Sequence, residues 1–167
     1  DDKVFVELKK KFKDVVYKRR DSMTLAQADA YLAGGAAPRP SQILREIDRF
    51  RLQYPVEPRV FIAYERTAWA GRLQPELRLT FDENIRWRAS RLDLSQGSEG
   101  EDLLEPGQIL MEIKIPGAMP LWLSRALSEL SIFPASFSKV GLCYTQHLAY
   151  GAALQHLTVR KGGVRCA

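Results

Sequence analysis

Charged and apolar side chains alternate in the first strand-like stretch, residues 4–12, and the charged types suit phosphate binding. Glu7, Lys9 and Lys11 fall on one face of a strand with a two-residue period, and the apolar side chains fall on the other. One carboxylate among several ammonium groups suits a polyanion that brings its own metal ion. A lysine-rich strand is also typical of a protected sheet edge. The choice between these interpretations depends on the strands that follow.

Several later stretches repeat this alternation, so the chemistry is expected to lie on a sheet. Strands with one apolar and one charged face are expected at residues 16–20, 59–69, 77–82, 85–91 and 109–115. A curled sheet would bring the charged faces together around a wet interior, whereas an ordinary sandwich would turn them outward. The periodicity alone leaves both arrangements open.

Helices are expected between and after the strands. Thr24 and Gln27 have the spacing of a capping box, Ser41 and Ser138 are suitable N-caps, and Pro120 suits a helix start. Residues 94–107, rich in Gly, Ser and acidic side chains, predict a mobile loop. The pattern indicates an α+β fold with antiparallel strands.

Composition narrows the function classes. The chain has 167 residues, a formal net charge of +5 and a pI near 9.3, so an anionic partner is expected. No apolar run approaches the roughly 20 residues of a membrane helix. Two cysteines, far apart, favour reduced thiols and a cytoplasmic protein. With no initiator Met and a start almost inside a strand, the chain is expected to be a fragment of a longer protein.

The residue types on the charged positions are those that phosphoryl transfer requires. Lysine and arginine bind phosphate oxygens, and a carboxylate holds the Mg²⁺ or Mn²⁺ that bridges them. Glu112 is the best metal candidate because it is the only acid on its strand, although a salt bridge to a lysine would also explain it. Glu7 is a weaker candidate. Asp82 is expected to initiate a turn before Asn84.

Six short segments together resemble the VTC domain, the polyphosphate polymerase branch of the triphosphate tunnel metalloenzymes (CYTH-like superfamily). The resemblance covers residues 4 to about 151, with the segments in the family's order. They are FVELK at 5–9, VYKRR at 16–20, YERTAW at 64–69, LRLTFD at 77–82, MEIKI at 111–115 and FSKVG at 137–141.

The resemblance implies a fold, a reaction and a set of site residues. The fold would be an antiparallel β-barrel, or tunnel, with flanking helices over residues 1–157, followed by a flexible tail at 158–167. The reaction would transfer the ATP γ-phosphate to a growing polyphosphate chain, with Mn²⁺ or Mg²⁺ bound. The catalytic residues would be Lys9, Lys18, Arg66, Arg78 and Lys139, the further substrate contacts Lys11, Tyr64 and Lys114, and the metal ligands Glu112 and Glu7.

Two departures from the family pattern bear on activity. Earlier strands with an inward Arg-x-Arg pair and another lysine are missing, so the tunnel would be open on one side. The fragment would then be inactive, rearranged, or paired as a homodimer that covers the open edge. A related triphosphate hydrolase would carry Glu-x-Glu-x-Lys where this chain has Glu7-Leu8-Lys9, which favours the polymerase branch.

Three alternatives to a polymerase remain at this stage. The first is the related hydrolase, and the second is a non-catalytic sensor that binds polyphosphate or phosphate compounds in the same tunnel. The third is a basic nucleic-acid-binding domain, which is disfavoured because the cations alternate with core positions on separate strands. The expected partners are therefore ATP and polyphosphate, with no nucleic acid and no membrane segment in this chain.

Overall fold

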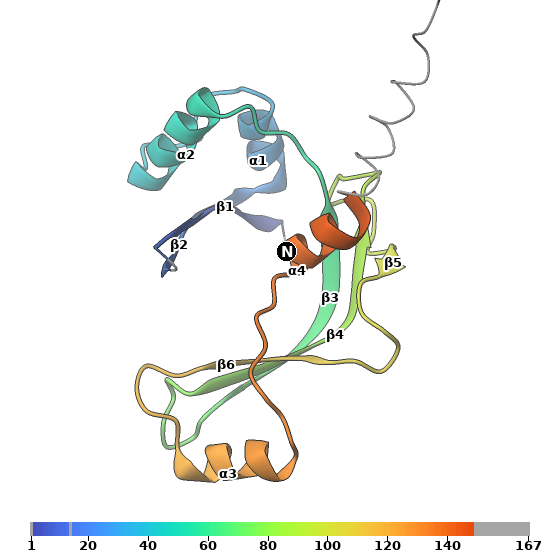
Figure 1. Cartoon of the computed structure of the whole chain (residues 1–167). Coiled ribbons are helices and arrows are strands. Elements are labelled where there is room, and N and C mark those ends of the chain that lie inside the picture. Colours follow the sequence, from blue (N-terminus) through green and yellow to red (C-terminus); the bar gives the residue numbers. More distant parts are fainter. Residues whose placement is uncertain (1, 14, 149–167) are drawn as a thin grey trace, which may run out of the picture. The chain divides into compact units, whose positions relative to one another are not determined.

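The computed structural model describes residues 2–13 and 15–148 and divides the chain into two compact units. The first ends at Glu57, and we call it the hairpin unit; the second begins at Pro58, and we call it the sheet unit. Each has its own hydrophobic cluster. The fold class is α+β with antiparallel strands, as predicted (Figure 1). The tail expected at 158–167 lies outside the described residues.

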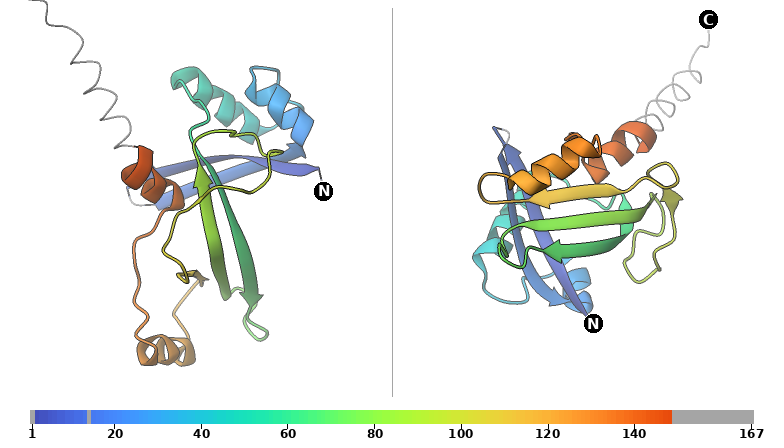
Figure 2. Two further views of the ribbon diagram at one scale, coloured as in Figure 1. Left: turned by 90° about the vertical axis from the view of Figure 1, so that its right-hand side faces the viewer. Right: turned by 90° about the horizontal axis from the view of Figure 1, so that it is seen from below.

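The hairpin unit consists of a two-stranded sheet with two helices over one of its faces (Figure 2). Its elements are β1 (Lys3–Phe12), β2 (Val15–Thr24), α1 (Leu25–Leu32) and α2 (Gln42–Gln53). The predicted capping box at Thr24 and Gln27 is present, and the Ser41 hydroxyl accepts a hydrogen bond from the Leu44 N–H. The core comprises Val6, Leu8, Met23, Ala28, Tyr31, Leu44 and Ile47. The lysines at positions 9 and 18 lie on the other face of the hairpin, away from this core.

The sheet unit is organised around one central strand. Its elements are β3 (Phe61–Ala70), β4 (Arg78–Arg88), β5 (Glu101–Asp102), β6 (Leu110–Lys114), α3 (Leu121–Glu129), α4 (Lys139–Cys143) and a π-helical turn at Tyr144–Leu148. Strand β4 pairs antiparallel with β3, β5 and β6. The buried cluster of this unit comprises Ile85, Trp87, Leu103 and Cys143. Strand β4 therefore carries both core residues and candidate site residues.

Strand β4 is continuous where two strands and a turn were expected. The separate strands predicted at 77–82 and 85–91 are one element, so the prediction that Asp82 initiates a turn is wrong. Asn84 adopts a φ of 48°, and the β3–β4 register shifts between Ala63 and Glu65. Asparagine tolerates the left-handed region better than most residues, so it accommodates an irregularity without ending the strand.

The segment 94–107 has more structure than the predicted mobile loop. It contains β5 and the buried Leu103, whose N–H donates to the Ile85 carbonyl at 2.8 Å. The guanidinium of Arg88 is nearly buried and donates to four backbone carbonyls of the residues that follow β4, those of Arg91, Asp93, Gly97 and Glu99. The arginine that ends β4 thus supplies order that the composition of the segment does not predict.

The described strands form two sheets, and no closed barrel occurs among the residues that the structure describes. The tunnel therefore stays a prediction. Within the same residues, no helix combines the length and the apolar character needed to span a lipid bilayer.

Candidate functional site

One face of the sheet unit collects charged side chains because of the strand register. Residues that lie directly opposite each other in antiparallel strands point to the same face, and successive residues alternate between faces. The opposed pairs on this face are Arg66 with Asp82, Thr80 with Glu112, and Arg78 with Lys114. We call it the charged face. The other face is mainly apolar and carries Trp69, Leu79, Phe81, Met111 and Ile113.

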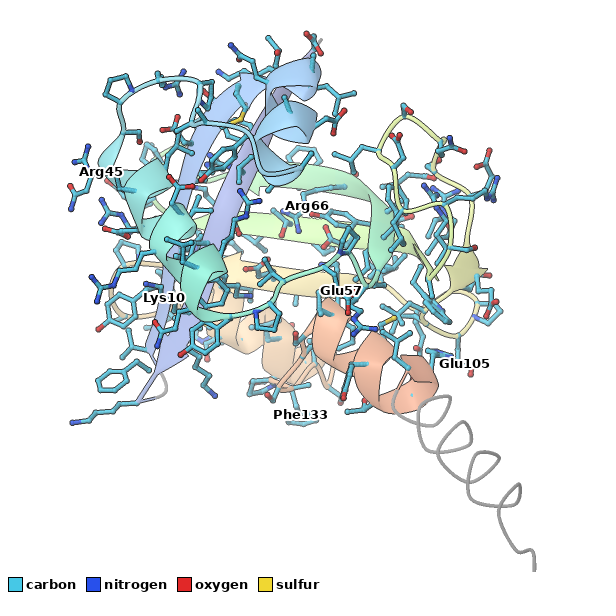
Figure 3. All side chains as sticks on the ribbon, turned by 90° about the horizontal axis from the view of Figure 1, so that it is seen from above. Lys10, Arg45, Glu57, Arg66, Glu105 and Phe133 are labelled. Carbon is cyan, nitrogen blue, oxygen red and sulfur yellow. The ribbon has the colours of Figure 1, made fainter. Side chains whose placement is uncertain are left out.

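Asp82 lies at the centre of the charged face and is fully buried. Its carboxylate accepts two hydrogen bonds from Arg66, from Nε at 2.5 Å and from Nη2 at 2.7 Å (Arg66 is labelled in Figure 3). It also accepts one from Lys139 Nζ at 2.5 Å. Bidentate, charge-assisted hydrogen bonds fix the plane of a guanidinium as well as its distance. Asp82 therefore joins β3, β4 and the start of α4.

The ionisation of this group follows from its contacts. Burial alone would raise the pKa of Asp82, but the hydrogen bonds and charges of Arg66 and Lys139 outweigh burial and hold that pKa below its usual value. The hydrogen bond to Asp82 raises the pKa of Arg66. Asp82 is therefore an anion and Arg66 a cation at neutral pH.

The ring of Tyr64 lies against both cations. Its centroid is 4.9 Å from the guanidinium carbon of Arg66 and 4.5 Å from Lys139 Nζ, within the range of cation–π attraction. Tyr64 is 40% exposed, so the ring lies between the cations and solvent without closing the group off. The predicted residues Tyr64, Arg66 and Lys139 thus lie together in the sheet unit.

Local sequence and packing together place Lys139 at this position. The Ser138 hydroxyl accepts a hydrogen bond from the Gly141 N–H at 3.2 Å and caps α4, as predicted. Cys143, fully buried at the other end of α4, packs in one cluster with Ile85 and Trp87 of β4. Because α4 is anchored on β4, its first residue reaches the Asp82 carboxylate.

Glu112, the predicted metal ligand, is the exposed carboxylate of the charged face. Its oxygens lie 3.2 Å from Lys114 Nζ and 3.8 Å from Arg66 Nη2. The alternative of a salt bridge is therefore present, but an ion pair between side chains that are 45% and 60% exposed is weak and readily exchanged.

The side chains available as ligands limit which kind of metal site this face could form. The described residues contain no group of three or more His, Cys, Asp or Glu side chains that could hold a metal. Mg²⁺ and Mn²⁺ commonly bind through one or two carboxylates together with substrate phosphates. Glu112 fits that mode, whereas Asp82 has already committed both oxygens to cations.

The remaining predicted residues lie on the hairpin. Lys9 lies opposite Lys18 and Lys11 opposite Val16, while Lys18 Nζ contacts a Glu7 oxygen at 2.8 Å. Glu7, the second predicted metal ligand, therefore has a lysine partner as Glu112 does. The meeting of hairpin and sheet cations in one tunnel stays a prediction.

Asp82 is the site residue that sequence reasoning missed. The alternation within LRLTFD already groups it with Arg78 and Thr80, but the turn expected before Asn84 removed it from the candidate site residues. The contact with Lys139 spans 57 positions of sequence, and no local pattern contains it.

Comparison with known proteins gives one match. The family model described as VTC domain matches residues 1–148. No curated protein and no solved structure matches the chain.

Proposed function

Since the chain belongs to the VTC domain family, which is associated with polyphosphate polymerase activity, we propose that it transfers the γ-phosphate of ATP to a growing polyphosphate chain. The terminal oxygen of the chain attacks the γ-phosphorus, the bond from that phosphorus to the β–γ bridging oxygen breaks, and ADP leaves. Catalysis of this transfer consists mainly of positioning and charge stabilisation. It therefore needs fixed cations more than it needs a nucleophile.

The observation that carries the proposal is the group of Arg66, Asp82, Lys139 and Tyr64. Two cations are held by one buried carboxylate and one aromatic ring. The charged face and Lys139 of α4 together have four cationic and two anionic side chains, a net charge of +2. Such a surface binds phosphate oxygens through several donors at once.

We assign individual roles on the basis of these positions. Arg66 and Lys139 bind the oxygens of the transferred phosphoryl group and stabilise the charge that develops there. Arg78 and Lys114, which are opposed on β4 and β6, bind neighbouring phosphates. We assign Lys9, Lys11 and Lys18 of the hairpin to phosphate binding as well. Glu112 would hold Mn²⁺ or Mg²⁺, with Glu7 as a second candidate, and the metal would neutralise phosphate charge when bound.

The test is polymer synthesis. The protein is incubated with ATP and Mn²⁺, and polyphosphate is followed on a gel beside Arg66→Ala and Glu112→Ala. We expect polymer from the wild type and about a 100-fold loss in Arg66→Ala, because a transition-state contact is removed. Arg72, exposed in the loop between β3 and β4, gives a matched control, and Arg72→Ala should leave synthesis unchanged.

Two results would contradict the proposal. A wild type that makes no polymer but binds polyphosphate equally well with Glu112→Ala would be a receptor. A wild type that releases inorganic phosphate from triphosphate without extending a chain would be a hydrolase.

A further inference from the structure

Among the described carboxylates of the sheet unit, Asp82 is unusual because it is fully buried. It is buried and negative, and it lies among groups proposed to bind an anion. A buried carboxylate repels phosphate and cancels one of the positive charges beside it. Its place at the centre of the charged face therefore calls for a role other than binding.

The geometry of the Arg66 contact suggests that role. A guanidinium has five N–H groups, and Asp82 accepts one from Nε and one from Nη2, which leaves both groups on Nη1 and one on Nη2. The bidentate contact fixes the plane and the direction in which these remaining donors point.

Lys139 is fixed by the same carboxylate. Its ammonium group gives one N–H to Asp82 at 2.5 Å and keeps two others, and its side chain is only 19% exposed. The Tyr64 ring, close to both cations, limits the directions in which either could turn. The two sets of remaining donors are thereby held a fixed distance apart.

We propose that Asp82 is a positioning residue that holds Arg66 and Lys139 in the arrangement in which both bind one phosphate group. The inference rests on the proposed function for the identity of the anion. Asp82 lowers the total charge of the site by one, and in return it fixes the orientation of two cations. Fixed orientation of the two cations stabilises the transition state more than it strengthens binding of the ground-state phosphate.

A double-mutant cycle on anion binding tests the proposal. Tripolyphosphate is titrated calorimetrically into the wild type, Asp82→Asn, Arg66→Ala and the double variant, all as the full chain. In the wild-type background, Arg66→Ala should weaken tripolyphosphate binding about tenfold. In the Asp82→Asn background the same substitution should weaken it less than about threefold, because a guanidinium that Asp82 does not orient contributes less to binding. Equal losses in the two backgrounds would overturn the proposal.

Glu65 offers a matched control carboxylate on the neighbouring position of β3. It points to the other face and contacts Asn84 at 2.9 Å and Arg86 at 3.3 Å. Glu65→Gln removes the same charge, and it should leave the tenfold cost of Arg66→Ala unchanged. If Glu65→Gln reduces the loss of affinity caused by Arg66→Ala as much as Asp82→Asn does, then the overall charge of the site, and not positioning, determines binding.

Turnover separates this inference from the proposed function. If the wild type makes polyphosphate, Asp82→Asn should lower kcat about tenfold or more while KM for ATP changes little. If the wild type makes none, the proposed polymerase function fails, and the binding cycle still decides the role of Asp82. If kcat of Asp82→Asn is unchanged and the binding losses of Asp82→Asn and Arg66→Ala are additive, positioning by Asp82 is excluded.

A measurement on the wild type covers the case in which Asp82→Asn does not fold. The Nε–H resonance of Arg66 is followed by NMR as tripolyphosphate is added. We expect it to keep the shift of an N–H bonded to a carboxylate, while the Nη resonances move. If the Nε resonance moves to that of a solvated arginine, Asp82 releases Arg66 on binding, and the proposal is wrong.

Discussion

The hairpin unit and the sheet unit both present cations on a sheet face, but they hold these cations differently. On the hairpin, Lys18 contacts Glu7, and the two side chains are 54% and 30% exposed. In the sheet unit, Arg66 and Lys139 contact Asp82, whose side chain is 1% exposed. Exposed ion pairs contribute little, whereas a buried charge that loses its partner is costly. By our proposal the sheet cations are pre-organised, whereas the exposed ion pair of Lys18 fixes that lysine only weakly.

The largest expected effect concerns what stabilises the hairpin unit. Leu44 of α2 is fully buried in its cluster, so Leu44→Ala should lower the free energy of unfolding by about 2–5 kcal/mol. Leu52, on the same helix, is 90% exposed, and Leu52→Ala should change it by less than about 0.5 kcal/mol. Urea denaturation measures both. Equal losses would show that the hairpin unit does not depend on this core.

The second effect compares cations from the two units in the same assay. Lys139→Ala should lower polyphosphate synthesis by about 100-fold, since it removes a held donor and leaves Asp82 with a single partner. Lys18→Ala should lower synthesis by about fivefold or less, because its surface ion pair fixes it weakly. Initial rates at saturating ATP measure the ratio. A larger loss in Lys18→Ala would reverse the comparison.

Sequence reasoning succeeded where structure is set by neighbouring residues. The capping box at Thr24 and the N-caps at Ser41 and Ser138 each depend on side chains within a few positions. Ser138 was predicted as an N-cap, and Lys139, which follows it, is the first residue of α4. Local hydrogen bonding and alternation therefore predict most of the elements.

It failed where a residue's role depends on a distant partner. An aspartate shortly before Asn84 has the signature of a turn, yet Asp82 is buried because Arg66 and Lys139 reach it from other elements. Arg88 likewise organises the segment after β4 through carbonyls that have no side-chain signature. Whether the two units line one tunnel depends on their arrangement, which neither alternation nor capping determines.

The third effect is the acid dependence of stability. A carboxyl whose pKa is lowered by folding stabilises the fold above its unfolded pKa, and this stabilisation is lost as the pH falls through the folded pKa. The pKa is lowered for Asp82, despite burial, and for Asp21, chiefly by its hydrogen bond with Ser41 and also by Arg39. Stability should therefore decrease below about pH 4.

The two aspartates should contribute unequally to that decrease. Protonation of Asp82 leaves two cations without their anion in a buried site, whereas protonation of Asp21 affects one ion pair, with the half-exposed Arg39. Asp82→Asn should therefore flatten the acid side of the stability curve more than Asp21→Asn does. Urea midpoints from pH 3 to 7 measure the slopes, and equal flattening would contradict the contrast between the units.

The smallest expected effect is a difference in salt dependence. The combined variant Lys9→Ala/Lys18→Ala should weaken tripolyphosphate binding about threefold at 50 mM NaCl, and the loss should nearly vanish at 500 mM, because salt screens exposed charges over a few ångströms. The loss in Lys139→Ala should persist at 500 mM, since that ammonium is largely shielded and contacts a buried carboxylate. Calorimetric titrations at the two salt concentrations measure both losses. If the Lys139 loss fades as fully as the hairpin loss, Asp82 does not pre-organise that cation, and the two faces bind phosphate in the same way.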